Sequence, residues 1–297
     1  MNVLEFHDVG LAYDDGAPVL DGVSLTVEAG QVVGLLGRNG AGKTTLIRIA
    51  MGMLAPRSGG VRVFGEDPRV DVVGVRRRIG YVSEVQELPS YLSVQDVFTM
   101  HRSLYPTWDD DVAGELCSRF ELPVGAKVAK LSKGQARQVA LLCAISHRPE
   151  LLILDEPAGG LDPAARREFL ETSIRHLGDT GSTILFSSHH MADVERMASR
   201  LVMIHDGQLW IDSAVDDVRE GYCLALVPDD GVDMHGRLLA TAGCLSVRQR
   251  EGSYRAVFER GADECEALLN RELGDGRARC MRVGLEEMFI ELVGGRS

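Results

Sequence analysis

The sequence predicts an α/β protein in which a mainly parallel sheet is covered by helices on both faces, followed by a smaller α+β domain. Three short apolar runs support the parallel sheet, because they are continuous rather than alternating and are separated by helical patterns. These runs are Gln31–Leu36, Leu151–Leu154 and Thr183–Phe186. Strands that alternate with helices are typical of a parallel sheet covered on both sides.

Two further features complete the first domain. Val3–Phe6 and Ser24–Val27 alternate apolar and polar residues, which predicts strands of an antiparallel edge sheet. Lys43–Met53 predicts a helix directly after the first apolar strand, and residues 93–148 are mostly helical in pattern. We therefore expect a helical subdomain over about residues 84–148.

The pattern changes near Asp212, which places the domain boundary between residues 1–213 and 214–297. In the second part we expect strands and helices in the order βαββαβ, followed by a last helix from Leu285. This order is that of a ferredoxin-like fold. The expected segments are 222–227, 232–242, 245–249, 254–259, 262–273 and 278–283.

Composition limits the class of protein. Of 297 residues, 45% are hydrophobic and 26% are charged, the balance of a soluble globular protein. No apolar run approaches the roughly 18–20 residues that span a bilayer, and the N-terminal residues lack the pattern of a secretory signal. The six cysteines form no C-x-x-C pair, so we interpret them as buried or incidental thiols of a reducing cytosol rather than a disulfide frame or zinc site.

The net charge of −12 argues against a general nucleic-acid binder, since such proteins present a basic face. It also gives no sign of direct adhesion to anionic lipid. Any association with a membrane is therefore expected to pass through a protein partner, and no nucleic acid is expected to bind.

The strongest motif is a glycine-rich loop between the first apolar strand and the following helix. Gly37–Thr44 fits G-x-x-x-x-G-K-[ST] in the strand–loop–helix context that the motif requires. Its glycines let backbone N–H groups surround phosphate oxygens at a helix N-terminus. Lys43 is expected to hold the β- and γ-phosphates, and Thr44 to offer its hydroxyl to Mg²⁺.

A second motif places two carboxylates at the end of a buried strand. Asp155 and Glu156 directly follow Leu151–Leu154. Ligands of open α/β sheets bind at the carboxyl ends of the strands, so these acids are expected beside the phosphates. Asp155 would bind Mg²⁺, directly or through water, and Glu156 would orient or deprotonate the attacking water.

Between these motifs, Leu131–Gln135 reads L-S-K-G-Q. It resembles the L-S-G-G-Q signature of ATP-binding cassette (ABC) proteins and stands about twenty residues before Asp155, the family's order. The resemblance covers residues 1 to about 213 densely and implies a P-loop ABC ATPase core that binds ATP and Mg²⁺. It also implies a head-to-tail dimer, in which one subunit's signature faces the γ-phosphate held by the other. The signature residues are Ser132, Lys133, Gly134 and Gln135.

The resemblance assigns further roles. Tyr13 resembles the aromatic residue that stacks on adenine, and Asp162 lies in a segment that resembles the D-loop joining the two half-sites. His189 resembles the switch histidine that contacts the γ-phosphate, with His190 as the alternative. The implied nucleotide-binding residues are Tyr13, Gly37, Arg38, Asn39, Gly40, Ala41, Gly42, Lys43, Thr44 and Thr45. The implied catalytic residues are Glu156, His189 and Lys43.

The sequence departs from the family pattern at three places. Glu84 stands where the family usually has glutamine, but a carboxylate can still approach Mg²⁺, so we keep Glu84 with Thr44 and Asp155 as metal ligands. Lys133 replaces the first signature glycine. Ala158 and Gly159 stand where Thr and Ser are frequent.

Taken together, these residues predict the ATP-hydrolysing subunit of an ABC transporter, which powers a separate integral-membrane permease, most simply as an exporter. Leu285–Leu292 resembles the closing helix of many bacterial exporter ATPases. The chain is expected in the cytoplasm, at the inner face of the membrane through the permease. Glu84–Tyr91 is the expected contact surface. The transported substrate is set by the permease and is not encoded here.

Three alternatives remain. An ABC ATPase that acts on ribosomes generally has two cassettes in one chain, whereas this chain has one. An ATPase of DNA repair or chromosome structure needs a long heptad insertion between the phosphate loop and the signature. A non-catalytic, ATP-gated scaffold is compatible with the altered residue Glu84.

Overall fold

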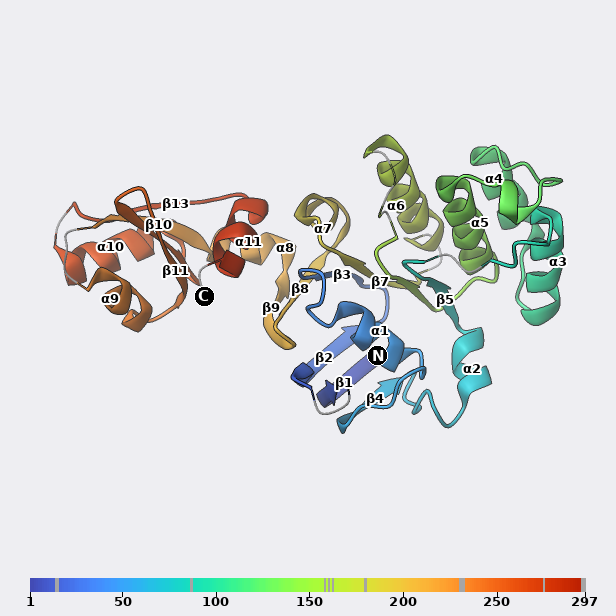
Figure 1. Cartoon of the computed structure of the whole chain (residues 1–297), viewed down its shortest axis with the longest axis horizontal. Helices are drawn as coiled ribbons and strands as arrows, with labels where there is room; N and C mark the ends of the chain where they lie inside the picture. Colours follow the sequence, from blue (N-terminus) through green and yellow to red (C-terminus); the bar gives the residue numbers. More distant parts are fainter. Residues whose placement is uncertain are drawn as a thin grey trace. The chain divides into compact units, whose positions relative to one another are not determined.

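The computed structural model (Figure 1) describes two compact units, one formed by Met1–His189 with Arg196–Asp212 and the other by His190–Glu195 with Ser213–Ser297. Each unit is described by itself below. The residues whose structure is described are 1–13, 16–85, 88–157, 159, 161, 163–178, 181–229, 233–274 and 276–294.

A six-stranded sheet with the order β5-β6-β7-β3-β8-β9 forms the centre of the first unit. The pairings β5–β6, β6–β7, β7–β3 and β3–β8 are parallel, and the residues of β6 and β7 are all buried. This confirms the mainly parallel sheet predicted from the continuous apolar runs. The strands are β3 (Val32–Leu36), β5 (Ile79–Val82), β6 (Leu151–Leu154), β7 (Thr183–Ser188), β8 (Arg200–His205) and β9 (Gln208–Ala214).

The predicted antiparallel edge sheet is also present, with the strand order β2-β1-β4. Its strands are β1 (Asn2–Ala12), β2 (Pro18–Glu28) and β4 (Ser58–Val63). Leu4, Phe6 and Val9 of β1 are buried in the same hydrophobic core as residues of β3 and of the helix that follows the glycine-rich loop. This packing anchors the loop between two sheets.

Helices of the first unit lie on both sides of the central sheet and in a helical segment between β5 and β6 (Figure 1). Ser93 and Ser132 each form a capping box at the start of a helix, which fixes where α3 and α5 begin. The helices are α1 (Lys43–Ala50), α2 (Val72–Arg77), α3 (Val94–Leu104), α4 (Asp110–Arg119), α5 (Lys133–Ser146) and α6 (Pro163–Gly178).

The first helix is shorter than the sequence predicts. Helix α1 ends at Ala50 rather than Met53, because Gly52 turns the chain with φ of 63°. A side chain at Gly52 would approach the carbonyl oxygen of Pro68 to 2.5 Å, so only glycine fits this left-handed position.

The second unit contains a four-stranded antiparallel sheet with the order β11-β12-β10-β13, and α9 and α10 belong to its β-α-β-β-α-β sequence. This is the element order of ferredoxin-like folds. The strands are β10 (Cys223–Pro228), β11 (Cys244–Arg250), β12 (Ser253–Phe258) and β13 (Arg279–Met281). The helices are α7 (Met191–Met197), which the division between the units crosses, α8 (Val215–Gly221), α9 (Met234–Ala240), α10 (Ala262–Leu273) and α11 (Leu285–Gly294).

Three of the six cysteines lie close together in the fold, although they are far apart in the sequence. Cys223, Cys265 and Cys280 come together in the second unit, with their sulfur atoms within 4.8 Å of one another. Residues 42 and 15 positions apart meet here because two strands of one sheet and the helix above it supply them. Cys223 and Cys265 are buried thiols, as the sequence predicts, but the spacing along the chain does not reveal that the three lie together.

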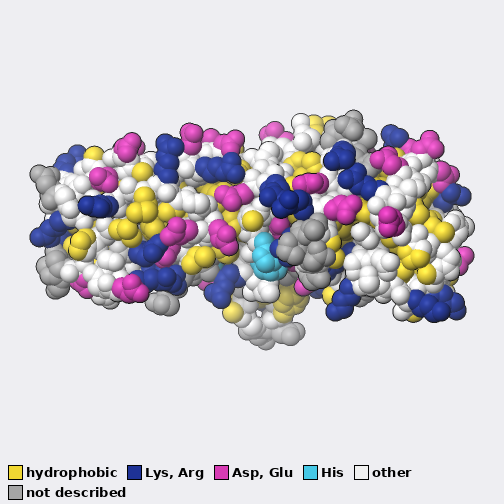
Figure 2. Space-filling model, turned by 90° about the horizontal axis from the view of Figure 1, so that it is seen from above, with side chains coloured by type: hydrophobic (Ala, Val, Ile, Leu, Met, Phe, Trp, Pro, Cys, Tyr) yellow, Lys and Arg dark blue, Asp and Glu magenta, His cyan; other side chains and the backbone are white. Residues whose placement is uncertain are grey.

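None of the helices in the described part of the chain is long and apolar enough to cross a membrane. Acidic and basic side chains are interspersed over the face of the molecule seen in Figure 2.

Candidate functional site

The glycine-rich loop joins β3 to α1, in the context that the sequence predicts. Gly40 and Gly42 have φ angles of 85° and 106°, which residues with a side chain rarely adopt. A Cβ atom on Gly42 would lie 2.8 Å from the carbonyl oxygen of Val19, and one on Gly37 would lie 2.6 Å from that of Ile204. The loop therefore needs glycine to pass between these strands and turn into the helix.

The crest of this loop is exposed, and its base is buried. Arg38, Asn39 and Gly40 are exposed, whereas Ala41 is buried and its N–H donates to the carbonyl oxygen of Arg38. Lys43, the first residue of α1, is only 5% exposed. Its ammonium group donates to the carbonyl oxygen of Gly37 at 2.7 Å, which points the charge into the loop.

The acidic pair lies directly beside this lysine. Glu156 Oε1 is 3.0 Å from Lys43 Nζ, and both side chains are almost fully buried. Glu156 itself has φ of 45°, a left-handed conformation that costs a non-glycine residue energy and often marks functional sites. The end of β6 therefore delivers this carboxylate to the phosphate loop, as predicted.

Asp155 is fully buried and only half satisfied. Its Oδ1 accepts hydrogen bonds from the hydroxyls of Thr44 (3.2 Å) and Ser187 (2.8 Å). Its Oδ2 is buried and accepts no hydrogen bond from the described residues. A buried carboxylate oxygen without a partner is costly, and a hard divalent cation would satisfy it. Thr44 and Asp155 thus fit a Mg²⁺ ion.

Burial raises the pKa of Asp155, because the charged carboxylate loses its hydration. Hydrogen bonds from Ser187 and Thr44 oppose this shift, whereas the neighbouring charges of Glu84 and Glu156 add to it. The negative charges of Glu84 and Glu156 thus act on Asp155, and a bound cation would relieve this repulsion.

His189 contacts the other oxygen of Glu156. Its Nδ1 lies 2.8 Å from Glu156 Oε2, so with Nδ1–H as the donor this ring holds the carboxylate in place. The structure thus joins His189 to the acidic pair. Ser187, two residues earlier on β7, accepts the backbone N–H of Glu156 at 2.7 Å. Ser187 is not predicted from the motifs, although a polar residue at the end of a buried strand is a signal for it.

Tyr13 and Thr45 are brought together at the start of α1. The Tyr13 hydroxyl lies 3.3 Å from Thr45 Oγ1, while 47% of the Tyr13 side chain surface remains exposed. An exposed aromatic ring beside the phosphate loop is available for stacking.

The signature residues form the N-terminus of α5. Ser132 Oγ accepts the backbone N–H of Gln135 at 3.1 Å, and Gln135 Oε1 accepts the N–H of Ser132 at 3.0 Å. Ser132 and Lys133 are exposed, so the lysine that replaces the first glycine of the motif meets no packing conflict. Gly134 would place a Cβ 3.4 Å from Leu161, an ordinary contact.

Arg137, which the sequence analysis did not select, connects three motifs. From the second turn of α5 its guanidinium donates to the carbonyl oxygens of Glu84 (2.8 Å) and Gly159. Burial lowers the pKa of Arg137, and the charges of Glu84 and Glu156 oppose that shift. Asp162 and Ala158 lie outside the described residues, so their roles stay predictions.

Comparison with known proteins identifies the family. A protein-family model described as ABC transporter matches residues 20–159. The chain is 30% identical over 282 residues to the ABC transporter ATP-binding protein YtrB of Bacillus subtilis (strain 168), covering 95% of each chain. It is 36% identical over 305 residues to the Nod factor export ATP-binding protein I of Sinorhizobium fredii (strain NBRC 101917 / NGR234), covering 98% of this chain and 86% of that one.

Among solved structures, one described as the ATP-binding subunit of an ABC transporter superposes with a TM-score of 0.67 at 30% identity. The match covers 73% of this chain and 92% of that one. A full-length relative, a matched family model and a shared fold thus agree with the motifs assembled around Lys43. The chain belongs to the family of ABC transporter ATP-binding proteins.

Proposed function

We propose that this chain binds ATP with Mg²⁺, hydrolyses it to ADP and phosphate, and thereby powers transport through a separate membrane permease. The observation that supports this most is the cluster at the phosphate loop, in which Glu156 contacts both Lys43 and His189 while Asp155 accepts a hydrogen bond from Thr44.

Binding would use the loop's backbone N–H groups and Lys43 against the β- and γ-phosphates. Thr44, Asp155 and Glu84 would hold Mg²⁺, which neutralises charge on the phosphate oxygens when bound. The exposed ring of Tyr13 would stack on the adenine base.

Hydrolysis needs a base that positions water on the γ-phosphate, and Glu156 is placed for this role. Water would attack phosphorus while Glu156 accepts its proton, and the bond to the ADP oxygen would break. His189 would keep Glu156 oriented through its Nδ1–H and could also contact the γ-phosphate.

The signature points to a second copy of the chain as partner. The Ser132 hydroxyl accepts the Gln135 N–H in the capping box and still has its own proton to donate. Since Ser132 is exposed, this proton is accessible to a γ-phosphate held by another subunit in a head-to-tail dimer. Asp162 would join the two half-sites.

Permease contact is proposed for the surface between the central sheet and the helical segment. A cavity of about 280 Å³ lies there, lined by residues of β5, α3 and α5 together with Leu88. Val85 and Tyr91, close by in the sequence, are 68% and 74% exposed and offer apolar surface that a permease would cover. Gln86 and Glu87, in the same predicted surface, lie outside the described residues. This contact would hold the chain at the inner face of the membrane.

Export is the direction we propose, because one relative is named a Nod factor export ATP-binding protein and aligns over 98% of this chain. The non-catalytic scaffold stays the second candidate, because Glu84 adds a carboxylate beside Asp155 in place of the usual neutral amide.

ATP hydrolysis by the purified chain decides between the two. We expect Mg²⁺-dependent turnover that Lys43→Ala abolishes and that Glu156→Gln lowers roughly 10²–10⁴-fold, the usual contribution of a general base. Glu156→Gln should still bind ATP and form an ATP-dependent dimer, followed by size-exclusion chromatography. Glu150→Gln is the matched control, because Glu150 is exposed and precedes the opposite end of the same strand.

Turnover in the wild-type chain that Glu156→Gln leaves intact would contradict the assigned base. ATP binding without any turnover, both alone and with a permease, would instead favour the scaffold.

A further inference from the structure

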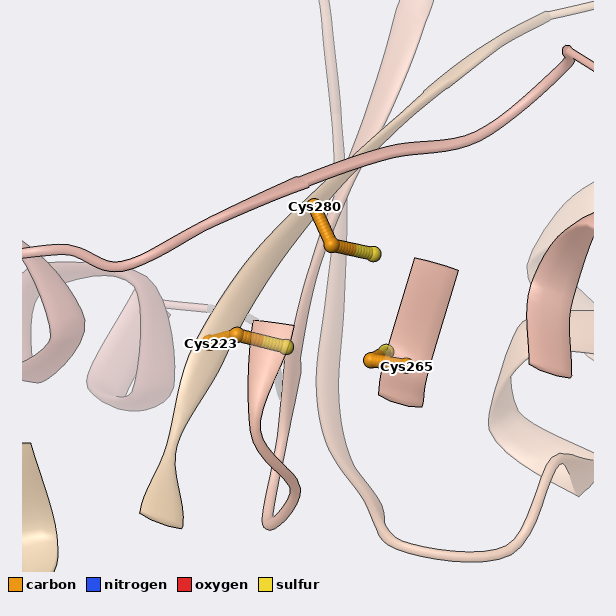
Figure 3. Close-up of side chains that lie close together, drawn as sticks. All are labelled: Cys223, Cys265 and Cys280. Carbon is orange, nitrogen blue, oxygen red and sulfur yellow. The ribbon is translucent and has the colours of Figure 1, made fainter. Parts of the chain in front are cut away.

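Three cysteines of the second unit converge on one point in its core (Figure 3). Cys223 comes from β10, Cys280 from β13 and Cys265 from α10, and the three sulfur atoms lie within 4.8 Å of one another. Cys223 and Cys265 are fully buried, and Cys280 is half-buried. None of them belongs to the nucleotide site.

The spacing of the sulfur atoms suits metal coordination. A thiolate–metal bond of about 2.3 Å sets the ligand sulfurs roughly 3.8–4.0 Å apart in tetrahedral or trigonal geometry. Sulfurs that already lie within 4.8 Å would reach these distances through small side-chain adjustments.

A disulfide between Cys223 and Cys280 fits this geometry less well. Cys280 pairs with Ala225 in the β10–β13 ladder, so Cys223 is its diagonal neighbour on the same face. Diagonal Cα atoms lie roughly 7–8 Å apart. Most disulfides join Cα atoms about 4.4–6.8 Å apart. A bridge between these strands would therefore need the backbone to move.

Contacts around the cluster hold it together. Glu266, adjacent to Cys265 on α10, accepts the backbone N–H of Cys280 at 2.8 Å, which ties β13 to the helix beside the sulfurs. Cys223 and Cys265 pack in the unit's hydrophobic core, which excludes water from two of the three ligands. The half-buried Cys280 provides the side from which an ion can enter.

We propose that Cys223, Cys265 and Cys280 form a three-thiolate site for a soft d¹⁰ metal cation. Thiolates select Cu⁺ and Zn²⁺ over hard cations such as Mg²⁺. No fourth histidine, cysteine or carboxylate joins the cluster among the described residues, whereas structural zinc sites almost always have four ligands. Three ligands therefore favour Cu⁺, and Zn²⁺ would need a water molecule. Binding would form three metal–sulfur bonds and release the thiol protons to the buffer.

The test is metal titration of the reduced, full-length chain under anaerobic conditions, with Cu⁺ and Zn²⁺ separately, each against a chromophoric chelator. We expect one ion per chain. Removing a residue that hydrogen-bonds to a metal ligand typically costs about 10–100-fold in metal affinity. Removing a ligand itself, as in Cys280→Ser, should therefore lower the metal affinity at least about 100-fold. Cys265→Ser should do the same.

Cys244→Ser is the matched control, because Cys244 lies in the same sheet, is also half-buried and is outside the cluster. Circular dichroism checks that each variant folds. If Cys265→Ser fails to fold, Cys280→Ser still tests the proposal, because it changes a residue that is only half-buried. The chelator competition ranks the two metals.

Two outcomes would overturn the proposal. The first is that the reduced chain binds neither metal, and the second is that Cys280→Ser binds as tightly as Cys244→Ser. Because the readout is metal affinity, it is independent of ATP hydrolysis.

Discussion

Arg137 shows how one side chain can organise the nucleotide site without facing the nucleotide. It is buried, and its guanidinium donates to two backbone carbonyls, those of Glu84 and Gly159. These carbonyls belong to the loop after β5 and to the segment that follows Glu156. A guanidinium presents several donors in a fixed planar fork and holds both carbonyls at once, whereas a lysine ammonium is a compact charge on a flexible stem and fixes their geometry less well.

We therefore predict that Arg137→Lys lowers kcat for ATP hydrolysis far more than it changes KM. Losing a hydrogen bond from a charged group costs about 1.5–3 kcal/mol, or roughly 10–100-fold in rate if the cost falls on the transition state. The contacts of Lys43 with the phosphate loop do not change, so KM for ATP should stay near the wild-type value. Steady-state kinetics measures both constants.

Arg148→Lys is the control, since this arginine is exposed and pairs with Asp109 away from the site. An Arg137→Lys enzyme whose KM rises while kcat holds would show that the residue supports binding rather than positioning.

For single residues, the sequence predicts positions that a local motif fixes, but not contacts that form between separate strands. Lys43, Thr44, Asp155 and Glu156 were predicted because each motif places them by its own backbone. Ser187 was not, because it reaches Asp155 through the β6–β7 register, in which Leu154 pairs with Phe186 and the next residues become neighbours. Such adjacency between strands is not visible in a single sequence.

Among the elements, the helical segment has a polar ring stack at its base. His147 caps the end of α5, and its nitrogens lie 3.1 Å from the Cys143 carbonyl and 3.2 Å from that of Ile79. Its ring stacks on Tyr105 at 4.1 Å, and His101 lies next in the stack. Burial lowers the pKa of both His101 and His147 below the ordinary value of 6.5.

A pH dependence of stability follows. Below about pH 6.5 the unfolded chain binds more protons at these histidines than the folded chain, so the free energy of unfolding falls as pH decreases. Above pH 6.5 this contribution is fully present. We expect Tm to drop between pH 7.5 and 5.5 and the drop to be smaller in His147→Gln. Calorimetry measures it, with exposed His235→Gln as a control that keeps the wild-type slope.

Elements were predicted where one strong pattern governs them. Helix α10 was predicted at Ala262–Leu273, the bounds found in the structure. Helix α2 was not predicted, because Val72–Arg77 contains three valines and a glycine, which favour other conformations. It forms because Asp71 accepts the Gly74 N–H at 2.9 Å and caps the first turn. The strands β8 and β9 were not predicted either.

At the scale of the whole molecule, buried ion pairs attach the last helix of the second unit to its sheet. Glu291 of α11 is 2% exposed and lies 2.9 Å from Arg255 Nε and 3.5 Å from Arg248 Nη1. These arginines belong to β12 and β11, so the last helix is fastened to two strands of its own sheet. The sequence pattern of α11 suggested a closing helix but not that one of its glutamates would be buried.

We predict that Glu291→Gln lowers the free energy of unfolding of the second unit by about 1.5–3 kcal/mol, the contribution of a hydrogen bond to a charged group, because Arg255 keeps its pair with Glu287 and Arg248 is partly exposed. Glu287→Gln removes the other carboxylate that pairs with Arg255, but Glu287 is 50% exposed, so its loss should cost at most about 1 kcal/mol. Calorimetry should show an earlier transition in Glu291→Gln only. Equal effects of the two variants would argue against a special role of the buried Glu291 ion pairs.

In its ion pair with Lys43, the Glu156 carboxylate occupies the role that a phosphate group of the nucleotide would take. The buried ammonium of Lys43 has an anionic neighbour 3.0 Å away, so its charge is compensated within the protein. An arriving γ-phosphate would replace one anion by another, and the displaced carboxylate would become available to water at that moment. Binding of the nucleotide would thus itself free the Glu156 carboxylate to act as the base.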